Sequence, residues 1–227
     1  VYLATLFAGK TPVMVNWTVG PRNMAHSLNL IGVRHVLTAK ALVSRLKAQG
    51  IHLDEISDRF VFMEDLRKKI SFVSKLLAYS KSHLSWSSLE HTKISDTAVI
   101  LFTSGSETRP KAVPLSHKNI MANIRDIPMM ATIRENDVMI GMLPPFHSFG
   151  ITTTMVLPLC MGLRTAYHPN PTEAPTIARL IKRYKVSLMV GTPTFLNGIM
   201  LASSKEQLHT LRLAISGAEK CPNSVYN

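Results

Sequence analysis

A run of small hydroxylic residues that ends in a lysine occupies positions 103–111. It reads Thr-Ser-Gly-Ser-Glu-Thr-Arg-Pro-Lys and directly follows the apolar stretch 97–102. Hydroxyl groups, the backbone amides near Gly105 and the ammonium of Lys111 could together surround phosphate oxygens. No glycine directly precedes Lys111, so the run differs from the G-x-x-x-x-G-K-S/T phosphate loop. Taken alone, the run indicates either a phosphate-binding loop or an ordinary Ser/Gly-rich turn.

Two further segments carry residues that suit a small-molecule site. Residues 143–150, Leu-Pro-Pro-Phe-His-Ser-Phe-Gly, present His147 on a loop, and residues 211–220 end an apolar stretch with Gly217 and Ala218. A histidine could act as a general base, but no carboxylate partner is visible in the sequence. Small residues at 217 and 218 would let a flat ring approach the backbone. Taken alone, His147 is more simply a structural histidine, and 217–218 fits a plain strand-to-loop junction equally well.

The elements that must position these residues alternate from residue 97 onward. Apolar runs typical of buried strands fall at 97–102, 138–143, 163–167, 186–190 and 211–215. Helical segments lie between them, at 118–127, 151–161, 174–184 and 195–202. This order predicts an α/β fold with mostly parallel sheets flanked by helices, in which ligands bind at the carboxyl ends of strands.

The first 95 residues predict a partial α/β subdomain. Its Ser- and His-rich end, 81–95, is the expected linker. We therefore expect a first subdomain over 1–95 and a second over 96–227, which contains the hydroxylic run and His147. The expected helices and strands of the first subdomain are helices at 3–7, 23–30, 41–48 and 66–79 and strands at 12–16, 35–38 and 59–63.

The segment Phe102–Val113 resembles the phosphate-binding signature of the adenylate-forming superfamily, which includes acyl-CoA synthetases, luciferases and peptide adenylation domains. Thr108 and Ala112 stand where glycine is usual in that signature. A β-branched residue at 108 disfavours a positive φ, so these departures bear on loop flexibility and nucleotide affinity. The resemblance implies that the phosphates of ATP are held by Thr103, Ser104, Gly105, Ser106, Glu107, Thr108 and Lys111.

The two other segments resemble the same family and follow in the family's order. Residues 143–150 resemble the segment that lines the acyl pocket, which implies that His147 is a wall or gate beside the reacting carboxylate. Residues 211–220 resemble the strand and loop that pack against adenine. The resemblance therefore implies that the nucleotide is also bound by Gly217, Ala218 and Glu219.

Within the superfamily, the chain is most similar to the acyl-acyl carrier protein synthetase branch, including the synthetase half of bifunctional acylglycerophosphoethanolamine acyltransferases. The similarity extends from about Leu6 to Pro222, and residues 16–18, 101–107, 146–150 and 217–220 suggest the branch. It implies activation of a fatty acid to acyl-AMP with ATP and Mg²⁺, then transfer to the thiol of an acidic acyl carrier protein. Lys111 and His147 would be the catalytic residues. The alternatives are a fatty acyl-CoA synthetase and a non-catalytic nucleotide- or membrane-binding domain.

The formal net charge of +12 over 227 residues favours an acidic partner. An acidic carrier protein and an anionic membrane contacted peripherally would both fit this charge. A missing part of the chain could also balance it, and no motif favours nucleic acid.

The two cysteines form no disulfide framework and no metal-binding pattern, and no signal peptide is visible. We therefore expect a cytoplasmic protein, which could in addition associate peripherally with the inner membrane face. The uncharged stretch 138–163 contains Pro144 and Pro145, which favours strand, loop and core helix over a membrane span.

Three further expectations concern the ends and the surface of the chain. The basic cluster Arg67, Lys68, Lys69 and Lys75 is expected to be a solvated helix face, with a carrier-protein or lipid-headgroup contact as the alternative. His91 and Asp96 have the H-x₄-D spacing of glycerolipid acyltransferases without that family's surroundings, and we decline that interpretation. The family's Tyr-Gly-x-Thr-Glu motif, ribose-binding aspartate and C-terminal catalytic lysine would lie beyond residue 227, so the chain alone is expected to be inactive or nearly so.

Overall fold

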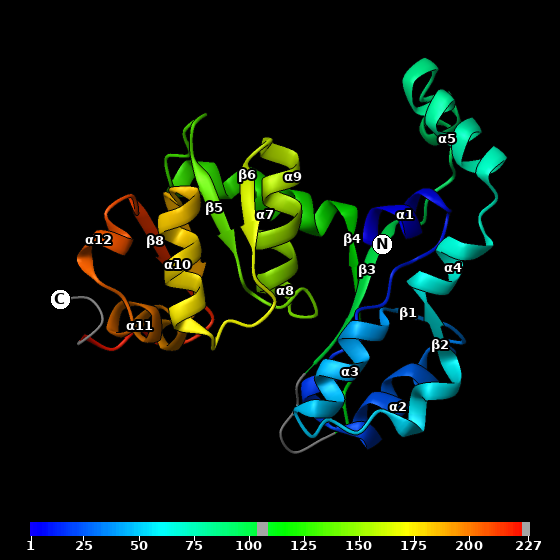
Figure 1. Cartoon of the computed structure of the whole chain (residues 1–227), viewed down its shortest axis with the longest axis horizontal. Coiled ribbons are helices and arrows are strands. Elements are labelled where there is room, and N and C mark those ends of the chain that lie inside the picture. The colour runs from blue at the N-terminus through cyan, green and yellow to red at the C-terminus, as the bar shows by residue number, and fades with distance from the viewer. Residues whose placement is uncertain (104–108, 224–227) are drawn as a thin grey trace. The chain divides into compact units, whose positions relative to one another are not determined.

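The structure is a computed structural model that describes residues 1–103 and 109–223 (Figure 1). The chain divides into two compact units, Val1–His117 and Lys118–Asn227. Each unit has its own apolar core and is described by itself. In the described residues, no helix is both long enough and apolar enough to cross a lipid bilayer.

The first unit packs two helices and a two-stranded parallel sheet around one apolar cluster. Met24 and Leu28 project from one helix and Leu46 from another into this cluster, where Leu53 and Ile56 join them. The elements of the unit are α1 (Tyr2–Phe7), α2 (Pro21–Leu30), β1 (Val36–Thr38), α3 (Lys40–Ala48), β2 (Phe60–Phe62), α4 (Met63–Lys69), α5 (Phe72–Leu84), α6 (Ser87–Glu90), β3 (Thr97–Phe102) and β4 (Ala112–Ser116).

A second sheet in this unit is an antiparallel hairpin of β3 and β4. The sequence predicts β3 with its observed bounds, but it does not predict β4, because Pro114 lies in the middle of that strand and proline argues against a strand interior. The predicted strand at 12–16 is wrong in extent: it forms a single bridge from Val13 to Ile100, and Asn16 instead accepts the amide of Thr18 at the start of a helical turn. By its contacts the hairpin falls in the first unit, whereas the sequence analysis assigned it to the second subdomain. The subdomain boundaries of the complete protein stay a prediction.

The helix expected over 66–79 is two helices, and that prediction is corrected. α4 ends at Lys69 and α5 begins at Phe72. Ser71 lies between them with extended backbone, and its hydroxyl accepts the amide of Ser74, which caps the new helix. The expected linker 81–95 contains the end of α5 and all of α6.

The second unit is a four-stranded parallel sheet with helices. The strand order is β6-β5-β7-β8, so the central strands β5 (Val138–Gly141) and β7 (Leu188–Gly191) are buried along their whole length and the edge strands are not. This is why these two strands are continuous apolar runs in the sequence. The other elements are α7 (His117–Met130), α8 (Ser148–Gly150), a π-helical segment (Ile151–Val156), α9 (Leu157–Met161), β6 (Arg164–Tyr167), α10 (Ala174–Tyr184), α11 (Pro193–Leu201), α12 (Lys205–Leu208) and β8 (Leu213–Ser216). The α/β fold with parallel sheets flanked by helices is thus confirmed, as is the strand, loop and helix expected over 138–163.

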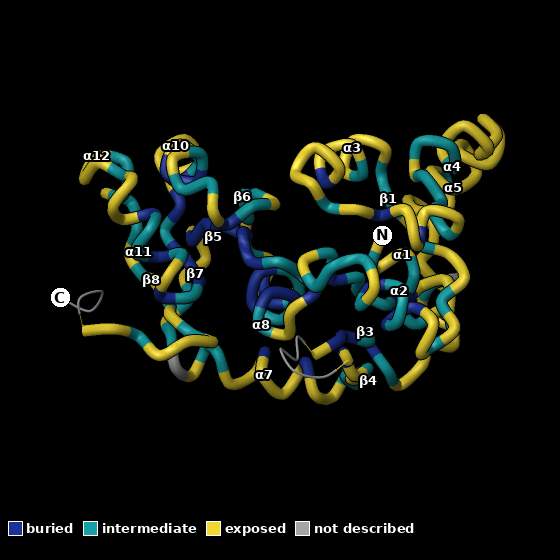
Figure 2. Tube along the Cα trace, turned by 90° about the horizontal axis from the view of Figure 1, so that it is seen from below, coloured by how far each residue is buried: buried dark blue, intermediate teal, exposed yellow. Residues whose placement is uncertain are grey.

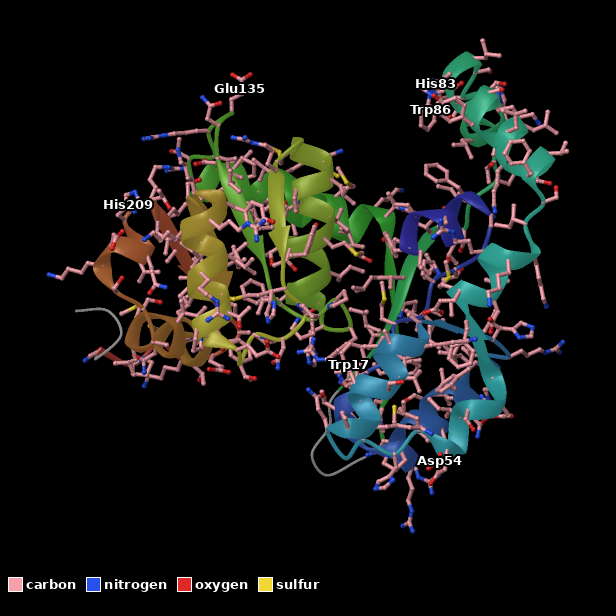
Figure 3. All side chains as sticks on the ribbon, in the orientation of Figure 1. Trp17, Asp54, His83, Trp86, Glu135 and His209 are labelled. Atoms are coloured by element: carbon pink, nitrogen blue, oxygen red, sulfur yellow. The ribbon has the colours of Figure 1, made fainter. Side chains whose placement is uncertain are left out.

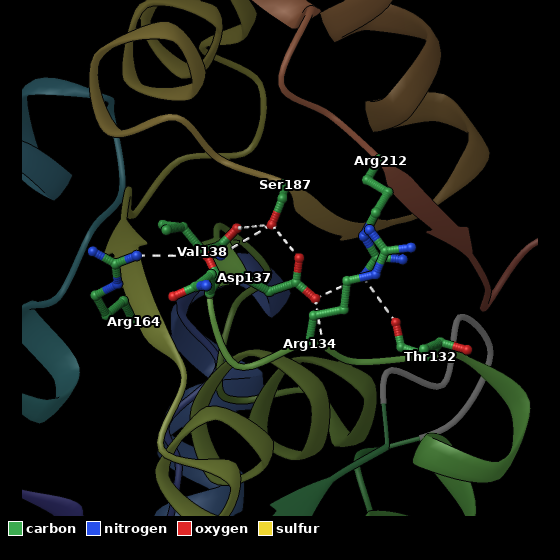
Figure 4. Close-up of polar contacts among 8 residues, drawn as sticks. Thr132, Arg134, Asp137, Val138, Arg164, Ser187 and Arg212 are labelled. Carbon is green, nitrogen blue, oxygen red and sulfur yellow. Dashed lines mark hydrogen bonds and ion pairs between the residues drawn. The ribbon is translucent and has the colours of Figure 1, made fainter.

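A polar network ties the amino ends of three of these strands together (Figure 4). The buried carboxylate of Asp137, before β5, accepts hydrogen bonds from the Arg212 guanidinium (2.6 Å), the Ser187 hydroxyl (2.6 Å) and the Arg134 amide (2.7 Å). Burial raises the pKa of Asp137, but the hydrogen bonds from Arg212, Ser187 and Arg134 outweigh it and hold the pKa below its ordinary value. This network therefore stabilises the amino edge of the sheet, and ligands are expected at the opposite, carboxyl edge.

Candidate functional site

The hydroxylic run 103–111 is closed at its base by two hydrogen bonds. The amide of Thr103 donates to the carbonyl oxygen of Lys111, and the amide of Lys111 donates to the Thr103 hydroxyl, both over 3.1 Å. Both residues are exposed, which leaves the Lys111 charge accessible to an anion at the neck of the loop. The pairing follows from the hairpin register, which sets Phe102 opposite Ala112. The remaining predicted members of the loop, Ser104, Gly105, Ser106, Glu107 and Thr108, lie outside the described residues.

His147 lies on the loop after β5, at the carboxyl edge of the second unit's sheet. Its amide donates to the carbonyl oxygen of Pro144 over 3.2 Å, which folds the loop back on itself. Its ring meets the buried ring of Phe146 edge to face, with centroids 4.7 Å apart. Partial burial lowers the pKa of His147 and so favours the neutral imidazole, although the residue keeps exposed surface. In the described parts of the chain no carboxylate bonds to this ring.

The turn after His147 depends on a close backbone approach at Gly150. A Cβ on Gly150 would lie 2.0 Å from the carbonyl oxygen of Pro144. The π-helical segment then begins, and the hydroxyls of Thr153 and Thr154 donate to the carbonyl oxygens of Phe149 and Gly150, each over 2.7 Å. Single π-helical turns are frequent at functional sites, so this irregular helix supports a site role for the loop that it follows.

The segment after β8 meets the His147 loop through an aromatic contact. A Cβ on Gly217 would come within 2.9 Å of Cζ of Phe149, so the ring fills the space that a side chain at 217 would need. The amide of Gly217 donates to the carbonyl oxygen of Gly191 over 3.1 Å. Ala218 has a φ of 67°, in the left-handed region that non-glycine residues rarely adopt. The structure thus brings two of the three predicted segments together, with the ring of Phe149 against the backbone of Gly217.

Thr194 belongs to this edge, and the sequence analysis missed it. Its hydroxyl donates to Oε2 of Glu219 over 2.8 Å and so connects the start of α11 to the predicted nucleotide-binding segment. Thr192 caps the same helix by accepting the amide of Phe195 over 3.4 Å. The signal was present: Gly-Thr-Pro-Thr follows a continuous apolar strand, and a threonine cap before a proline at the first helical turn marks a helix start at the sheet's carboxyl edge.

A histidine–carboxylate pair at the end of β6 was also missed. Nε2 of His168 lies 3.0 Å from Oε2 of Glu173, and the Asn170 amide nitrogen donates to Oε1 of the same carboxylate over 3.1 Å. The His168 amide donates to the carbonyl oxygen of Gly141 over 3.0 Å. The side-chain pair closes the β6–α10 loop on itself, and the backbone bond holds the loop against β5.

The predicted site residues fall in both units. Thr103 and Lys111 lie together in the first unit, and His147, Gly217, Ala218 and Glu219 lie at the carboxyl edge in the second. In the described residues no group of three or more His, Cys, Asp or Glu side chains could hold a metal ion. Mg²⁺ commonly reaches a nucleotide site on the phosphates themselves, with few or no dedicated protein ligands.

A family model described as "AMP-binding enzyme" matches residues 1–227. The chain is 26% identical over 236 residues to "Probable 4-coumarate--CoA ligase 3" of Dictyostelium discoideum, covering 96% of this chain and 42% of that protein. It is 24% identical over 246 residues to "Long-chain-fatty-acid--CoA ligase" of Salmonella typhimurium, covering 96% and 43%. The chain thus spans about two fifths of the length of these relatives.

The fold is similar to that of o-succinylbenzoate CoA synthetase (MenE) from Bacillus subtilis in complex with the acyl-adenylate intermediate OSB-AMP. The TM-score is 0.74 at 18% sequence identity, and the match covers 99% of this chain and 42% of that one. At this identity the likeness shows the fold alone. The chain has the α/β fold of the N-terminal domain of adenylate-forming enzymes.

Proposed function

The chain belongs to the AMP-binding enzyme family, and we propose that it is the ATP- and acid-binding part of an acid–thiol ligase. The observation that carries the proposal is the packing of Phe149 on Gly217. This contact joins the segment expected to line the acyl pocket to the segment expected to hold adenine. An acid and a nucleotide bound on the two sides of this contact would meet at the carboxyl edge of the sheet, where ligands of parallel sheets bind.

The first step of the proposed reaction forms acyl-AMP. A carboxylate oxygen of the acid attacks the α-phosphorus of ATP, the bond to the bridging oxygen breaks, and pyrophosphate leaves. Lys111 and the donors of the hydroxylic run would hold the phosphates and neutralise charge that develops on them. Mg²⁺ bound to the triphosphate would add charge neutralisation. Neutral His147 would limit access to the carboxylate without adding a charge of its own.

A fatty acid is the acid that we propose. The segment beyond His147 is apolar, with Leu157 buried and Met155 and Val156 half-buried, and carries no Asp, Glu, Lys or Arg between 138 and 163. Such a wall suits an alkyl chain. The names of several relatives as long-chain-fatty-acid–CoA ligases support the same acid class.

In the second step a thiol attacks the acyl carbon of acyl-AMP, and AMP leaves. The expected acceptor was the thiol of an acidic carrier protein, for which the +12 charge is the supporting observation. Coenzyme A is better supported, because the named relatives are CoA ligases. We therefore propose coenzyme A as the acceptor and keep the carrier protein as the alternative.

Fatty-acid-dependent exchange of labelled pyrophosphate into ATP tests the first step in the complete protein. We expect exchange by the wild type and at least a ten-fold loss with Lys111→Ala. Lys118→Ala removes another exposed lysine, from the first turn of α7, and should leave exchange unchanged. The absence of exchange with acids of any chain length would contradict an enzyme and leave a nucleotide-binding domain.

The acceptor is tested separately, after exchange has been measured. Coenzyme A and a phosphopantetheinylated carrier protein are offered at equal concentration, and the thioester formed on each is quantified. Preferential acyl-CoA formation is the expected result. Preferential acylation of the carrier protein would replace coenzyme A in the proposal without affecting the adenylation step.

A further inference from the structure

Helix α5 exposes an apolar face along its whole length. None of its residues is buried in the described structure, and Figure 2 shows the helix exposed over nearly all of its turns. Phe72, Val73, Leu76, Leu77 and Leu84 have exposed fractions between 54% and 84%. A helix of this length is marginally stable in water by itself, so an exposed apolar face on it indicates a surface that a partner covers.

The apolar residues lie on one face with a lysine at each edge, and Ser80 and His83 lie within the same arc. At 100° per residue they span an arc of roughly 160°, from Tyr79 and Phe72 at one side to Leu77 at the other. Lys75 lies about 40° beyond the first side and Lys81 about 40° beyond the second. Lysines in these positions can lay their alkyl stems along an apolar surface and keep their ammonium groups in a polar layer.

The segment around this face is strongly basic. Between Leu66 and Leu89 there are five Lys or Arg residues and no Asp or Glu. The acidic residues just before it are engaged elsewhere, because Asp65 pairs with the Lys40 ammonium over 2.8 Å and Glu64 accepts the Lys40 amide over 2.9 Å. The covering partner is therefore expected to be anionic.

Aromatic residues mark the C-terminal end of the face. The rings of Tyr79 and His83 meet edge to face with centroids 4.5 Å apart, and Trp86 follows the helix with 58% of its surface exposed (Figure 3). Tyrosine and tryptophan combine an apolar ring with a polar tip, which suits the boundary between lipid and water.

We propose that α5, together with the basic turn Arg67–Lys69 and Trp86, is an interfacial helix that binds the surface of an anionic phospholipid bilayer. A wide apolar face, lysines at both edges and a basic flank are the features of helices that lie in the plane of such a surface. A second copy of the chain would bring like charges together and is disfavoured. A helix that binds in the groove of an acidic protein typically uses a single row of apolar side chains, which is narrower than the apolar face of α5.

Co-sedimentation of the full chain with vesicles tests the proposal. We expect binding to phosphatidylcholine vesicles that contain 30–40% phosphatidylglycerol (about one anionic lipid in three, as in a strongly anionic leaflet) and at least ten-fold weaker binding to pure phosphatidylcholine. Binding should fall as salt is raised from about 0.05 to 0.5 M, since charges at the surface are screened.

Two pairs of matched variants separate the apolar and the basic contributions. Leu84→Glu should weaken vesicle binding about ten-fold or more, whereas Leu201→Glu, at a leucine of nearly equal exposure (84% and 81%), should leave it unchanged. Lys75→Gln with Lys81→Gln should weaken binding about five-fold for each lysine, and Lys205→Gln with Lys220→Gln should not. All six positions carry exposed side chains, so circular dichroism should show unchanged folding.

The fluorescence of Trp86 reports the same contact without sedimentation. Trp17→Phe leaves Trp86 as the only tryptophan, and we expect a blue shift of its emission with anionic vesicles. Any of three results would overturn the proposal: no binding to anionic vesicles, binding that Leu84→Glu and Leu201→Glu weaken equally, or α5-dependent association of two chains, or with an acidic protein, in place of vesicle binding. None of these readouts requires ligase activity, so the proposal can fail while the proposed function stands.

Discussion

The ring of Phe149 lies against Gly217, although 68 residues separate them in the chain (217 − 149). A Cβ at 217 would be 2.9 Å from Cζ of Phe149 and 3.4 Å from both Cε atoms, closer than van der Waals contact at the nearest atom. The packing of this ring therefore requires a glycine at 217. The contact is the point at which the His147 loop and the segment after β8 meet.

Gly217→Ala is expected to push the Phe149 ring away and to weaken ATP binding by about three- to ten-fold, with a stability loss of about 1 kcal/mol. Calorimetric titration with ATP and urea denaturation measure the two effects. Adding Phe149→Leu should restore part of the affinity, because the smaller side chain makes room for the methyl group. Gly198→Ala is the matched control, since a Cβ at that helical position meets nothing within 4 Å and should stabilise α11 by about 0.5–1 kcal/mol. Equal effects of the two alanines would contradict the packing argument.

Among glycine-to-alanine changes in the second unit, Gly150→Ala is expected to cause the largest loss of stability. The new Cβ would lie 2.0 Å from the carbonyl oxygen of Pro144, a backbone atom that cannot rotate away. We expect a loss of about 3 kcal/mol in the free energy of unfolding, together with displacement of the His147 loop. Urea denaturation measures the first, and hydrogen exchange of the amides of 147–151 measures the second. A loss below about 1 kcal/mol would mean that the loop can move aside.

Asp137→Asn is expected to destabilise the second unit by about 2–4 kcal/mol, because Arg212 and Ser187 lose a buried charged acceptor. The pKa of Asp137 is lower in the folded protein than in the unfolded chain. The folded state therefore binds the proton less well, and the carboxylate contributes stability at neutral pH that is lost as the pH falls through the pKa of the unfolded chain and then that of the folded protein. Melting temperature against pH checks this.

The control for that experiment is Asp65→Asn, which removes an exposed carboxylate that pairs with Lys40. Exposed pairs contribute little to stability, so this variant should melt close to the wild type at neutral pH. In the Asp137→Asn variant the acid limb of the stability profile should be shallower than in the wild type. An unchanged acid limb would show that other carboxylates govern acid unfolding.

Ala218→Gly is expected to raise stability by up to about 1 kcal/mol, because glycine adopts the left-handed backbone at 218 without a Cβ clash. Lys185→Gly is the matched control, since Lys185 has a φ of 52° at the end of α10 and should gain stability in the same way. Only the Ala218 variant should change ATP affinity, because only Ala218 lies in the proposed nucleotide segment. A change of affinity in both variants would point to an indirect effect of stability.

The second half of the fold could be predicted from the sequence because its signals are local. The strands β5 and β7 are continuous apolar runs, and α10 has its predicted bounds, since the central strands of a parallel sheet are buried on both faces and the helix beside them buries one face. The predicted site segments at 143–150 and 211–220 follow two of these strands, and the carboxyl ends of parallel strands meet at one edge.

The tertiary structure decided everything that depends on a partner distant in the chain. Exposed Val113 and Pro114 belong to strand β4 only because they pair with the backbone of β3. Ser71 separates α4 from α5 by capping the second helix, which the periodicity of the sequence does not predict. The bond from Thr194 to Glu219 joins helix α11 to the segment after β8, and the ion pair of Arg212 with Asp137 joins the segments before β8 and β5. Ala218 has its left-handed φ in the same segment after β8. Spacing along a sequence indicates which face of a helix or strand a residue occupies, whereas long-range hydrogen-bond partners and strained backbone angles are set only when the chain has folded.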